Sequence, residues 1–294
     1  MSMRILSLGA GVQSSTLAFM IERGEVGPVD CAIFADVGNE PKKVYDFLDY
    51  IEENVSFPIQ RVSAGNLGED FLAVMRGEKG RCSTPPFSVV VGNRDEAPPP
   101  IENLASAIEG LGFEVQVATR HAKNTGPRVG RLWRQCTRDY KIRPILKRIR
   151  RMLKERGEAM AVQLIGISTD EAHRMKQAEA GYLENQWPLV DMGMSRRDCE
   201  SWLRVRGYRM PPKSACYFCP YISNARLREM RDKDPDSYDK AVKFDRALRD
   251  ARVDRSKYAG DVFIHRDGVP LEDVDLGDDQ GELFGEECEG MCGL

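Results

Sequence analysis

The sequence lacks several features that mark large classes of protein. No apolar run approaches the roughly 20 residues that a membrane helix needs, so a membrane-spanning protein is excluded. The start of the chain lacks the charged, apolar and small-residue regions of a signal peptide, and we therefore expect a cytoplasmic protein. Only three histidines are present, with no Ser-His-Asp arrangement and no His-x-x-x-His pair on a predicted helix.

What is present is typical of a globular protein. The chain has 294 residues, of which 41% are hydrophobic and 30% are charged. This balance can bury a real core and excludes collagen-like and wholly disordered chains. At roughly 100–200 residues per domain, the length allows one large domain or two small ones.

The charge is unevenly distributed although its net value is only −3. Residues 128–156 contain twelve Lys and Arg but only two acids, whereas residues 261–294 contain eleven acids and one Arg. The basic segment predicts an anionic partner, a nucleotide or a nucleic acid; the alternative is a solvated helix face. The acidic segment is interpreted as a mobile tail or as a cover for the basic segment.

Hydrophobic patterning predicts alternating strands and helices. Strands are expected at residues 3–9, 29–34, 58–62 and 161–167, and helices at 14–21, 42–51, 145–153, 196–207 and over most of 224–251. Strand, helix, strand, helix, strand within sixty residues favours right-handed crossovers and a parallel sheet. We expect residues 80–100, which are rich in proline, to be an irregular insertion.

A glycine-containing loop lies between the first predicted strand and helix. Residues 9–15 read Gly-Ala-Gly-Val-Gln-Ser-Ser. Small residues let a phosphate approach the backbone, where amide groups and the helix N-terminus favour negative charge. The loop is neither a Walker A motif nor the dinucleotide fingerprint, because no Gly-Lys-Ser/Thr follows and Ser14 holds the third glycine position. The alternative is a tight strand–helix turn.

This loop resembles the PP-loop of adenine-nucleotide α-hydrolases, whose usual form is Ser-Gly-Gly-x-Asp-Ser. Residues 34–41, Phe-Ala-Asp-Val-Gly-Asn-Glu-Pro, are similar to the Asp-Thr-Gly-x-x-Phe-Pro-Glu segment of sulfonucleotide (APS/PAPS) reductases. Residues 166–174 and the Trp-Pro-Leu at 187–189 resemble later segments of the same family. The resemblance runs in order through roughly residues 3–222. It implies an α/β fold with a doubly wound parallel sheet and a helical, cysteine-bearing C-terminal region.

The resemblance also implies a nucleotide at the carboxyl ends of the strands. Its cofactor-binding residues would be Ser7, Gly9, Ala10, Gly11, Gln13, Ser14, Ser15, Asp36, Gly166 and Arg174, with Arg134, Arg138 and Lys141 as contacts to substrate or anion. Two positions depart from the family pattern. Gln13 stands where the family has an acid, so the carboxylate expected near a phosphate-bound magnesium is missing. Ser168 stands where the family has an arginine.

The cysteines form a second set of candidate site residues. Cys216 and Cys219 make a C-x-x-C, and Cys136 precedes them by 80 residues. Zinc binding, a redox pair and chance are alternatives. The spacing resembles the four cysteines that hold a [4Fe–4S] cluster in APS reductases, with Gln135 in place of one of them. Thiolates suit such clusters, and three of them leave one iron open. Cys31 and Cys199 are predicted to be packed residues.

The last residues resemble the Glu-Cys-Gly-Leu/Ile-His end of sulfonucleotide reductases, whose cysteine attacks sulfur. Cys292 is the matching candidate catalytic residue, without the final histidine. A surface thiol or a cluster ligand is the alternative. Neighbouring acids would raise its pKa, unless the tail docks against the basic segment.

Three functions follow as expectations. The first is an Fe–S-dependent enzyme, similar to tRNA and DNA sulfurtransferases of this family, that adenylates an acceptor with ATP and then transfers sulfur. Nucleic acid is a candidate acceptor, and a cysteine desulfurase or thiol reductant is a candidate sulfur partner. The second is an APS/PAPS reductase that uses Cys292. The third is a non-catalytic nucleotide-binding protein with a structural metal.

The domain organisation expected from these motifs has three parts. Residues 1–210 would form the nucleotide-binding domain, with an insertion at about 80–130. Residues 211–260 would form the helical C-x-x-C region, and residues 261–294 the acidic tail.

Overall fold

The computed structural model describes residues 2–80, 83–91, 115–116, 128–251 and 260–277. These residues form two compact units, each built from two stretches of the chain. The first unit contains residues 2–64 and 137–215, and the second contains the described residues of 65–136 and 216–277. None of the described helices is long and apolar enough to cross a membrane. The domain boundaries expected from the sequence stay a prediction.

The first unit is built on a parallel five-stranded sheet in the order β3-β2-β1-β7-β8. Its strands are β1 (Met3–Leu8), β2 (Cys31–Asp36), β3 (Ile59–Ser63), β7 (Ala161–Ile165) and β8 (Leu183–Gln186). The chain adds β2 and β3 on one side of β1, then β7 and β8 on the other. Such a reversal leaves a crevice at the carboxyl ends of the two central strands.

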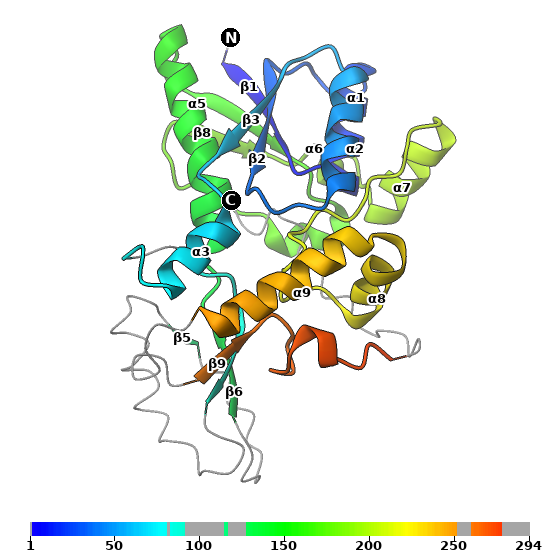
Figure 1. The fold of residues 1–294 in the computed structure, drawn as a ribbon. Coiled ribbons are helices and arrows are strands. Elements are labelled where there is room, and N and C mark those ends of the chain that lie inside the picture. The colour runs from blue at the N-terminus through cyan, green and yellow to red at the C-terminus, as the bar shows by residue number, and fades with distance from the viewer. Residues whose placement is uncertain (1, 81–82, 92–114, 117–127, 252–259, 278–294) are drawn as a thin grey trace. The chain divides into compact units, whose positions relative to one another are not determined.

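Helices cover both faces of this sheet (Figure 1). One face packs against α1 (Val12–Glu22), α2 (Lys42–Glu53), the short α6 (Pro188–Asp191) and α7 (Arg196–Val205). The other packs against α5 (Arg143–Arg156), which follows η1 (Thr137–Ile142). Amphipathic spacing explains α2, whose four buried side chains recur at helical intervals. The predicted fold class, α/β with a doubly wound parallel sheet, is confirmed.

The second unit has an antiparallel sheet in the order β5-β6-β4-β9. Its strands are β4 (Ser88–Val91), β5 (Val115–Gln116), β6 (Arg128–Leu132) and β9 (Gly260–Phe263). Its helices are α3 (Leu67–Met75), α8 (Asn224–Lys233) and α9 (Pro235–Asp250), with a 3-10 turn, η3 (Leu271–Asp273). The expectation that residues 80–100 are irregular is wrong for β4, a run of three valines that pairs with both β6 and β9.

The predicted long helix near the C-terminal end is divided in two. Asp234 ends α8 and caps α9 by accepting a hydrogen bond from the backbone N–H of Ser237. Pro235 occupies the first position of α9, where its missing N–H costs nothing. A proline after a capping residue therefore marks a new start within the helical pattern.

Candidate functional site

The β1–α1 turn has the backbone geometry of an anion-binding loop. Ala10 takes a left-handed conformation (φ 53°), rare for a residue with a side chain, and it is fully buried. Gly11 is the N-cap, and no described side chain caps the helix. The Ser14 hydroxyl instead accepts a hydrogen bond from the Gly9 N–H at 3.2 Å. The first N–H groups of α1 therefore remain available, and no acid in the first turn offsets the positive end of the helix.

Gly166, which follows β7, lies against this first turn. A Cβ placed on Gly166 would come within 2.7 Å of the Ser14 backbone N and Cα and within 3.0 Å of the Gln13 carbonyl carbon. Only glycine allows this approach, because real Cβ atoms essentially never come closer than 3.0 Å. The end of β7 and the start of α1 are thus held together at the reversal of strand order.

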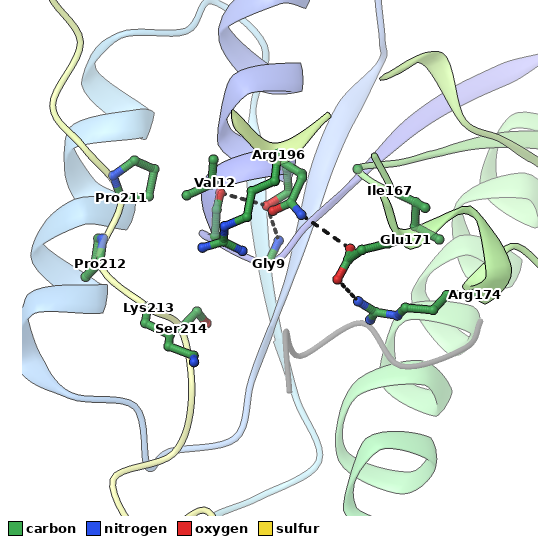
Figure 2. Close-up of a pocket in the computed structure, with 14 residues that line it drawn as sticks. Gly9, Val12, Ile167, Glu171, Arg174, Arg196, Pro211, Pro212, Lys213 and Ser214 are labelled. Atoms are coloured by element: carbon green, nitrogen blue, oxygen red, sulfur yellow. Dashed lines mark hydrogen bonds and ion pairs between the residues drawn. The ribbon is translucent and has the colours of Figure 1, made fainter. Parts of the chain in front are cut away.

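A pocket opens at this point and is lined by the first unit alone (Figure 2). Its volume is about 550 Å³ including the open mouth. The lining residues come from the β1–α1 turn, the end of β7, the 3-10 turn η2 (Thr169–Arg174), the start of α7 and the segment that follows α7. They are Gly9, Gly11, Val12, Gln13, Ser14, Gly166, Ile167, Glu171, Arg174, Arg196, Pro211, Pro212, Lys213 and Ser214.

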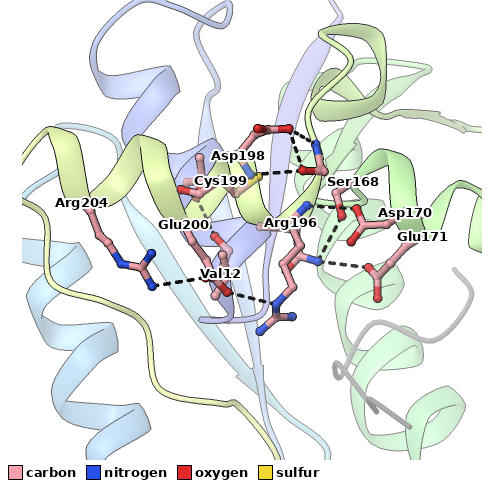
Figure 3. Close-up of polar contacts among 12 residues, drawn as sticks. Val12, Ser168, Asp170, Glu171, Arg196, Asp198, Cys199, Glu200 and Arg204 are labelled. Atoms are coloured by element: carbon pink, nitrogen blue, oxygen red, sulfur yellow. Dashed lines mark hydrogen bonds and ion pairs between the residues drawn. The ribbon is translucent and has the colours of Figure 1, made fainter. Parts of the chain in front are cut away.

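The charged lining residues are predominantly positive. Arg174, Arg196 and Lys213 come from three separate elements, and Glu171 is the one carboxylate among the lining residues described. Arg174 pairs with Glu171. Arg196 lies 3.4 Å from a carboxylate oxygen of Glu200, one turn further along α7 (Figure 3). Three cations against one lining acid favour an anionic ligand.

Arg196 is positioned by its neighbours at the start of α7. Ser195 and Asp198 form a capping box, so α7 begins at Arg196. The backbone N–H of Arg196 donates to the Asp170 carboxylate at 3.0 Å (Figure 3). This bond ties the start of α7 to η2, and both elements contribute a cation to the pocket.

The two positions that depart from the PP-loop pattern contact each other. The Gln13 side-chain amide donates to the Ser168 hydroxyl and to the Glu171 carboxylate, both at 3.3 Å. Gln13 is 2% exposed, and Ser168 is fully buried. The Gln13 Oε1 has no hydrogen-bond partner among the described residues. An acid at position 13 would face the Glu171 carboxylate, so glutamine suits this environment.

Of the predicted nucleotide-binding residues, six line the pocket: Gly9, Gly11, Gln13, Ser14, Gly166 and Arg174. Ser7, Ala10 and Ser15 are fully buried beside it. Asp36 ends β2 and accepts hydrogen bonds at 2.8 Å from the Gly38 N–H and from the Tyr45 hydroxyl. Burial, together with the bond to Asp36, raises the Tyr45 pKa. The role of all ten in nucleotide binding stays a prediction.

The predicted anion contacts have other neighbours in the structure, and their role stays a prediction. Lys141 is 3.5 Å from Glu40, a carboxylate with 1% of its side chain exposed, which also accepts a hydrogen bond from the Ser214 hydroxyl. Arg138 is exposed and lies beside Asp139. Arg134 belongs to the second unit and lies over the Tyr221 ring at 5.3 Å. None of the three is among the lining residues described.

Sequence reasoning missed Arg196 and the segment Pro211 to Ser214. The capping box at Ser195 could have placed Arg196 at a helix start. Nothing local marks Lys213 as a neighbour of the β1–α1 turn, from which it is separated by about two hundred residues.

The candidate metal ligands Cys136, Cys216 and Cys219 lie in the second unit, each half-buried. Cys216 and Cys219 form a turn in which the Cys219 N–H donates to the Cys216 carbonyl at 3.0 Å. No group of three or more His, Cys, Asp or Glu placed to hold a metal ion occurs among the described residues. The [4Fe–4S] cluster expected from these cysteines stays a prediction. Cys292 lies outside the described residues.

Cys31 and Cys199 are buried, as predicted for packed residues. Burial raises the thiol pKa to about 11 for Cys31 and to about 12 for Cys199. Neither thiol is prepared to act as a nucleophile near neutral pH.

The first unit defines an α/β protein with a doubly wound parallel sheet and a cation-lined pocket at its switch point. No family model and no curated protein matches the sequence. Among solved structures, the chain is similar to phosphoadenylyl-sulfate (PAPS) reductase from Candida auris, solved as a phosphate complex. The identity is 12% and the TM-score 0.40, over 72% of this chain and 76% of that one. A similarity at this identity and TM-score indicates neither the substrate nor the reaction of this protein.

Proposed function

We propose that the first unit binds an adenine nucleotide with its phosphates in the pocket, and that the chain uses ATP to adenylate an acceptor. One observation carries the proposal. The uncapped start of α1 opens on a pocket whose described lining has three cationic side chains and a single carboxylate. Amide groups at a helix N-terminus and cations from separate elements are what a polyphosphate needs.

The residues have distinct parts in this reaction. The N–H groups at the start of α1 hold phosphate oxygens, and Gly166 keeps the end of β7 close to them. An acceptor oxygen attacks the α-phosphorus, the bond from that phosphorus to the bridging oxygen breaks, and pyrophosphate leaves with the bonding electrons. Arg174, Arg196 and Lys213 stabilise the charge that develops on pyrophosphate.

In a second step, the outer sulfur of a persulfide attacks the adenylated atom of the acceptor. A bond to sulfur forms, the bond to the bridging oxygen breaks, and AMP leaves with the bonding electrons. AMP is a better leaving group than a carbonyl or phosphate oxygen, which is why activation precedes transfer. In this proposal a cysteine desulfurase supplies the sulfur as a persulfide. A thiol reductant then cleaves the remaining S–S bond, which releases the thiolated acceptor while the reductant is oxidised to a disulfide. The resemblance of residues 9–15 and 166–174 to PP-loop enzymes supports it.

No step is assigned to a metal. Glu171 is the one carboxylate among the lining residues described, and its two oxygens accept hydrogen bonds, one from Arg174 and the other from Gln13. The described cysteines of the second unit belong to no group of three or more residues placed to hold a metal ion, and the proposed steps are written without an iron–sulfur cluster.

The experiment compares Arg196→Gln with Arg204→Gln. Both arginines lie on α7 and both contact Glu200, but only Arg196 is among the residues that line the pocket. Loss of one charge-assisted hydrogen bond should weaken ATP binding about 10- to 100-fold in Arg196→Gln, measured by titration calorimetry. Arg204→Gln should bind ATP as the unchanged protein does.

Products separate the alternatives. Pyrophosphate and AMP formed from ATP with a candidate acceptor support adenylation. Sulfite formed from APS or PAPS, with no pyrophosphate from ATP, would replace the proposal with a reductase. Saturable ATP binding without any product would indicate a nucleotide-binding protein that does not catalyse a reaction. If both arginine substitutions changed the ATP affinity equally, ATP would not bind in this pocket.

A further inference from the structure

Helix α5 concentrates positive charge on the first unit. Its fourteen residues include seven Lys or Arg and one acid, Glu155. Arg151 lies 3.4 Å from Glu155 on the same helix, and the other six cations fall into two groups with different surroundings. Arg148 donates to the Gln60 side chain, and Arg156 pairs with Asp30 at 2.6 Å. Those two arginines are bound to the body of the unit.

Four other cations form a single stripe. Arg143, Lys147, Arg150 and Lys154 are separated by four, three and four residues and are all exposed. At 3.6 residues per turn they lie within about 60° of one another around the helix, and they span about 16 Å along it. The buried side chains of α5, namely Ile145, Ile149, Met152 and Leu153, lie on the opposite side of the helix.

The charges of this stripe are largely uncompensated. Arg143 pairs with Asp139 at 2.6 Å but keeps 61% of its side chain exposed. Lys147, Arg150 and Lys154 have no carboxylate within ion-pair distance in the part of the chain that the structure describes. Like charges three and four residues apart destabilise a helix. An array of this kind favours a partner that carries a regular row of negative charges.

We propose that the stripe of Arg143, Lys147, Arg150 and Lys154 binds the phosphate backbone of a nucleic acid. A nucleic-acid backbone presents closely spaced phosphates that a row of Lys and Arg neutralises. A bilayer suits the helix less well. None of the described exposed large hydrophobic residues lies on α5, whose apolar side is packed against the sheet, whereas a membrane-bound helix needs that side for the lipid.

The direction of α5 gives the stripe an orientation within the unit. Because α5 leads into β7 of a parallel sheet, it begins near the carboxyl ends of the strands and runs toward their amino ends. Lys141, just before α5, contacts Glu40, which follows the carboxyl end of β2. A bound backbone would therefore extend along α5 toward the edge of the sheet that carries the pocket. The inference does not depend on nucleotide binding there.

The test uses the full chain with the substitutions Lys147→Gln, Arg150→Gln and Lys154→Gln combined. Fluorescence anisotropy follows binding to a 20-base-pair DNA duplex, a single-stranded DNA and an RNA duplex between 50 and 200 mM salt. For the DNA duplex, each lost phosphate contact should reduce the slope of log K against log salt by about 0.9. We expect a reduction of about two to three, with the tightest of the three probes identifying the kind of nucleic acid.

A matched control removes the same charge elsewhere. Lys233, Lys240 and Lys243 are exposed on α8 and α9 of the second unit and also make no ion pair among the described residues. Their triple change to Gln should leave the affinity and the salt slope unchanged. Circular dichroism should show both variants folded, since all six side chains are exposed, and ATP titration of the stripe variant should match that of the unchanged protein.

Three results would overturn the inference. Equal loss in the stripe and control variants would indicate general charge attraction. Absence of binding to all three probes at 50 mM salt would remove the proposed partner. Binding of vesicles containing anionic lipid that is lost in the stripe variant, with nucleic-acid binding unchanged, would assign the stripe to a membrane surface. If the unchanged protein bound nucleic acid but not ATP, the proposed function would be wrong and the inference about the stripe would stand.

Discussion

The two units are assembled from the chain in different ways. In the first, β1, α1, β2, α2 and β3 follow one another within residues 3–63, and the pocket opens where β7 joins them. In the second, β4 pairs with β9, so that Ser88 faces Phe263 across more than 170 residues. The first unit begins with neighbouring crossovers and completes its site with residues 166–214, whereas the sheet of the second unit pairs distant strands from the start.

The difference shows where each unit is vulnerable. The pocket of the first unit depends on close backbone approach at a strand reversal, which a single added atom disturbs. The second unit holds distant segments together with buried polar groups. Asp245, 1% exposed, accepts hydrogen bonds from the backbone N–H groups of Ile264 and Leu271 at 2.8 and 3.0 Å.

The largest effect is expected at Gly166. In Gly166→Ala the new Cβ would lie 2.7 Å from the Ser14 backbone, so β7 or α1 must shift. Overpacking of this kind costs about 1–3 kcal/mol in unfolding free energy, and we expect ATP binding to be lost as well. Gly181→Ala is the control, because nothing lies within 4 Å of a Cβ there. Urea unfolding measures the loss of stability and ATP titration measures the loss of binding. An unchanged urea midpoint in Gly166→Ala would show that Gly166 does not lie tightly against the Ser14 backbone.

An intermediate effect is expected from Gln13→Asp. The substitution removes the bonds to Ser168 and Glu171 and places a carboxylate in the neighbourhood of the Glu171 carboxylate. Leaving buried groups unpaired costs about 1–3 kcal/mol. If the two departures from the PP-loop pattern are coupled, adding Ser168→Arg should recover part of the loss.

A double-mutant cycle measured by urea unfolding gives the coupling between the two positions, which we expect to be about 0.5–3 kcal/mol. Strictly additive losses would show that positions 13 and 168 act independently.

The smallest effect is a pH dependence in the second unit. His265 is buried; its Nε2 lies 3.0 Å from the Asn224 side-chain oxygen, and its Nδ1 accepts a hydrogen bond from the Asp267 N–H. Burial lowers its pKa below the ordinary 6.5, although the Asp267 carboxylate opposes the shift. The unfolded state therefore binds the proton more readily, and stability should fall as pH decreases below about 6.5.

Urea unfolding at pH 7.5 and 5.5 measures this dependence, and His265→Gln should reduce it. The first unit serves as the comparison. Burial raises the pKa of Asp30, but the hydrogen bonds from Arg156 and the Arg4 N–H outweigh it, so the pKa is lowered below 3.8. The stability that this carboxylate contributes is lost only at still lower pH. The prediction would be contradicted if the first unit lost more stability than the second between pH 7.5 and pH 5.5.

The sequence predicted the parts that depend on local pattern. The strands at residues 3–9, 29–34 and 161–167 correspond to β1, β2 and β7. Gly9, Gly11 and Ser14 line the pocket, and their role in nucleotide binding stays a prediction. Each of these features arises within a short segment of the chain, where apolar spacing and glycine placement are decisive. The apolar face of α2 could be predicted for the same reason.

Other features depend on tertiary contact and could not be predicted. Gln13 and Ser168 look like two separate departures from a pattern, yet they share a hydrogen bond across 155 residues. Lys141 belongs to the basic segment, but a buried Glu40 lies beside it. Local sequence contains neither the partner nor the burial that determines the role of such a residue.

The strand order of the first unit has a consequence for its synthesis. β1 is an interior strand of the sheet, yet its neighbour β7 emerges more than 150 residues later. At roughly 5–20 residues per second, one edge of β1 waits about 8–30 s on the ribosome before its partner is made. During that interval, an apolar strand edge is open to pairing with other chains. The order in which the strands are made therefore favours chaperone protection of the nascent chain until β7 has been synthesised.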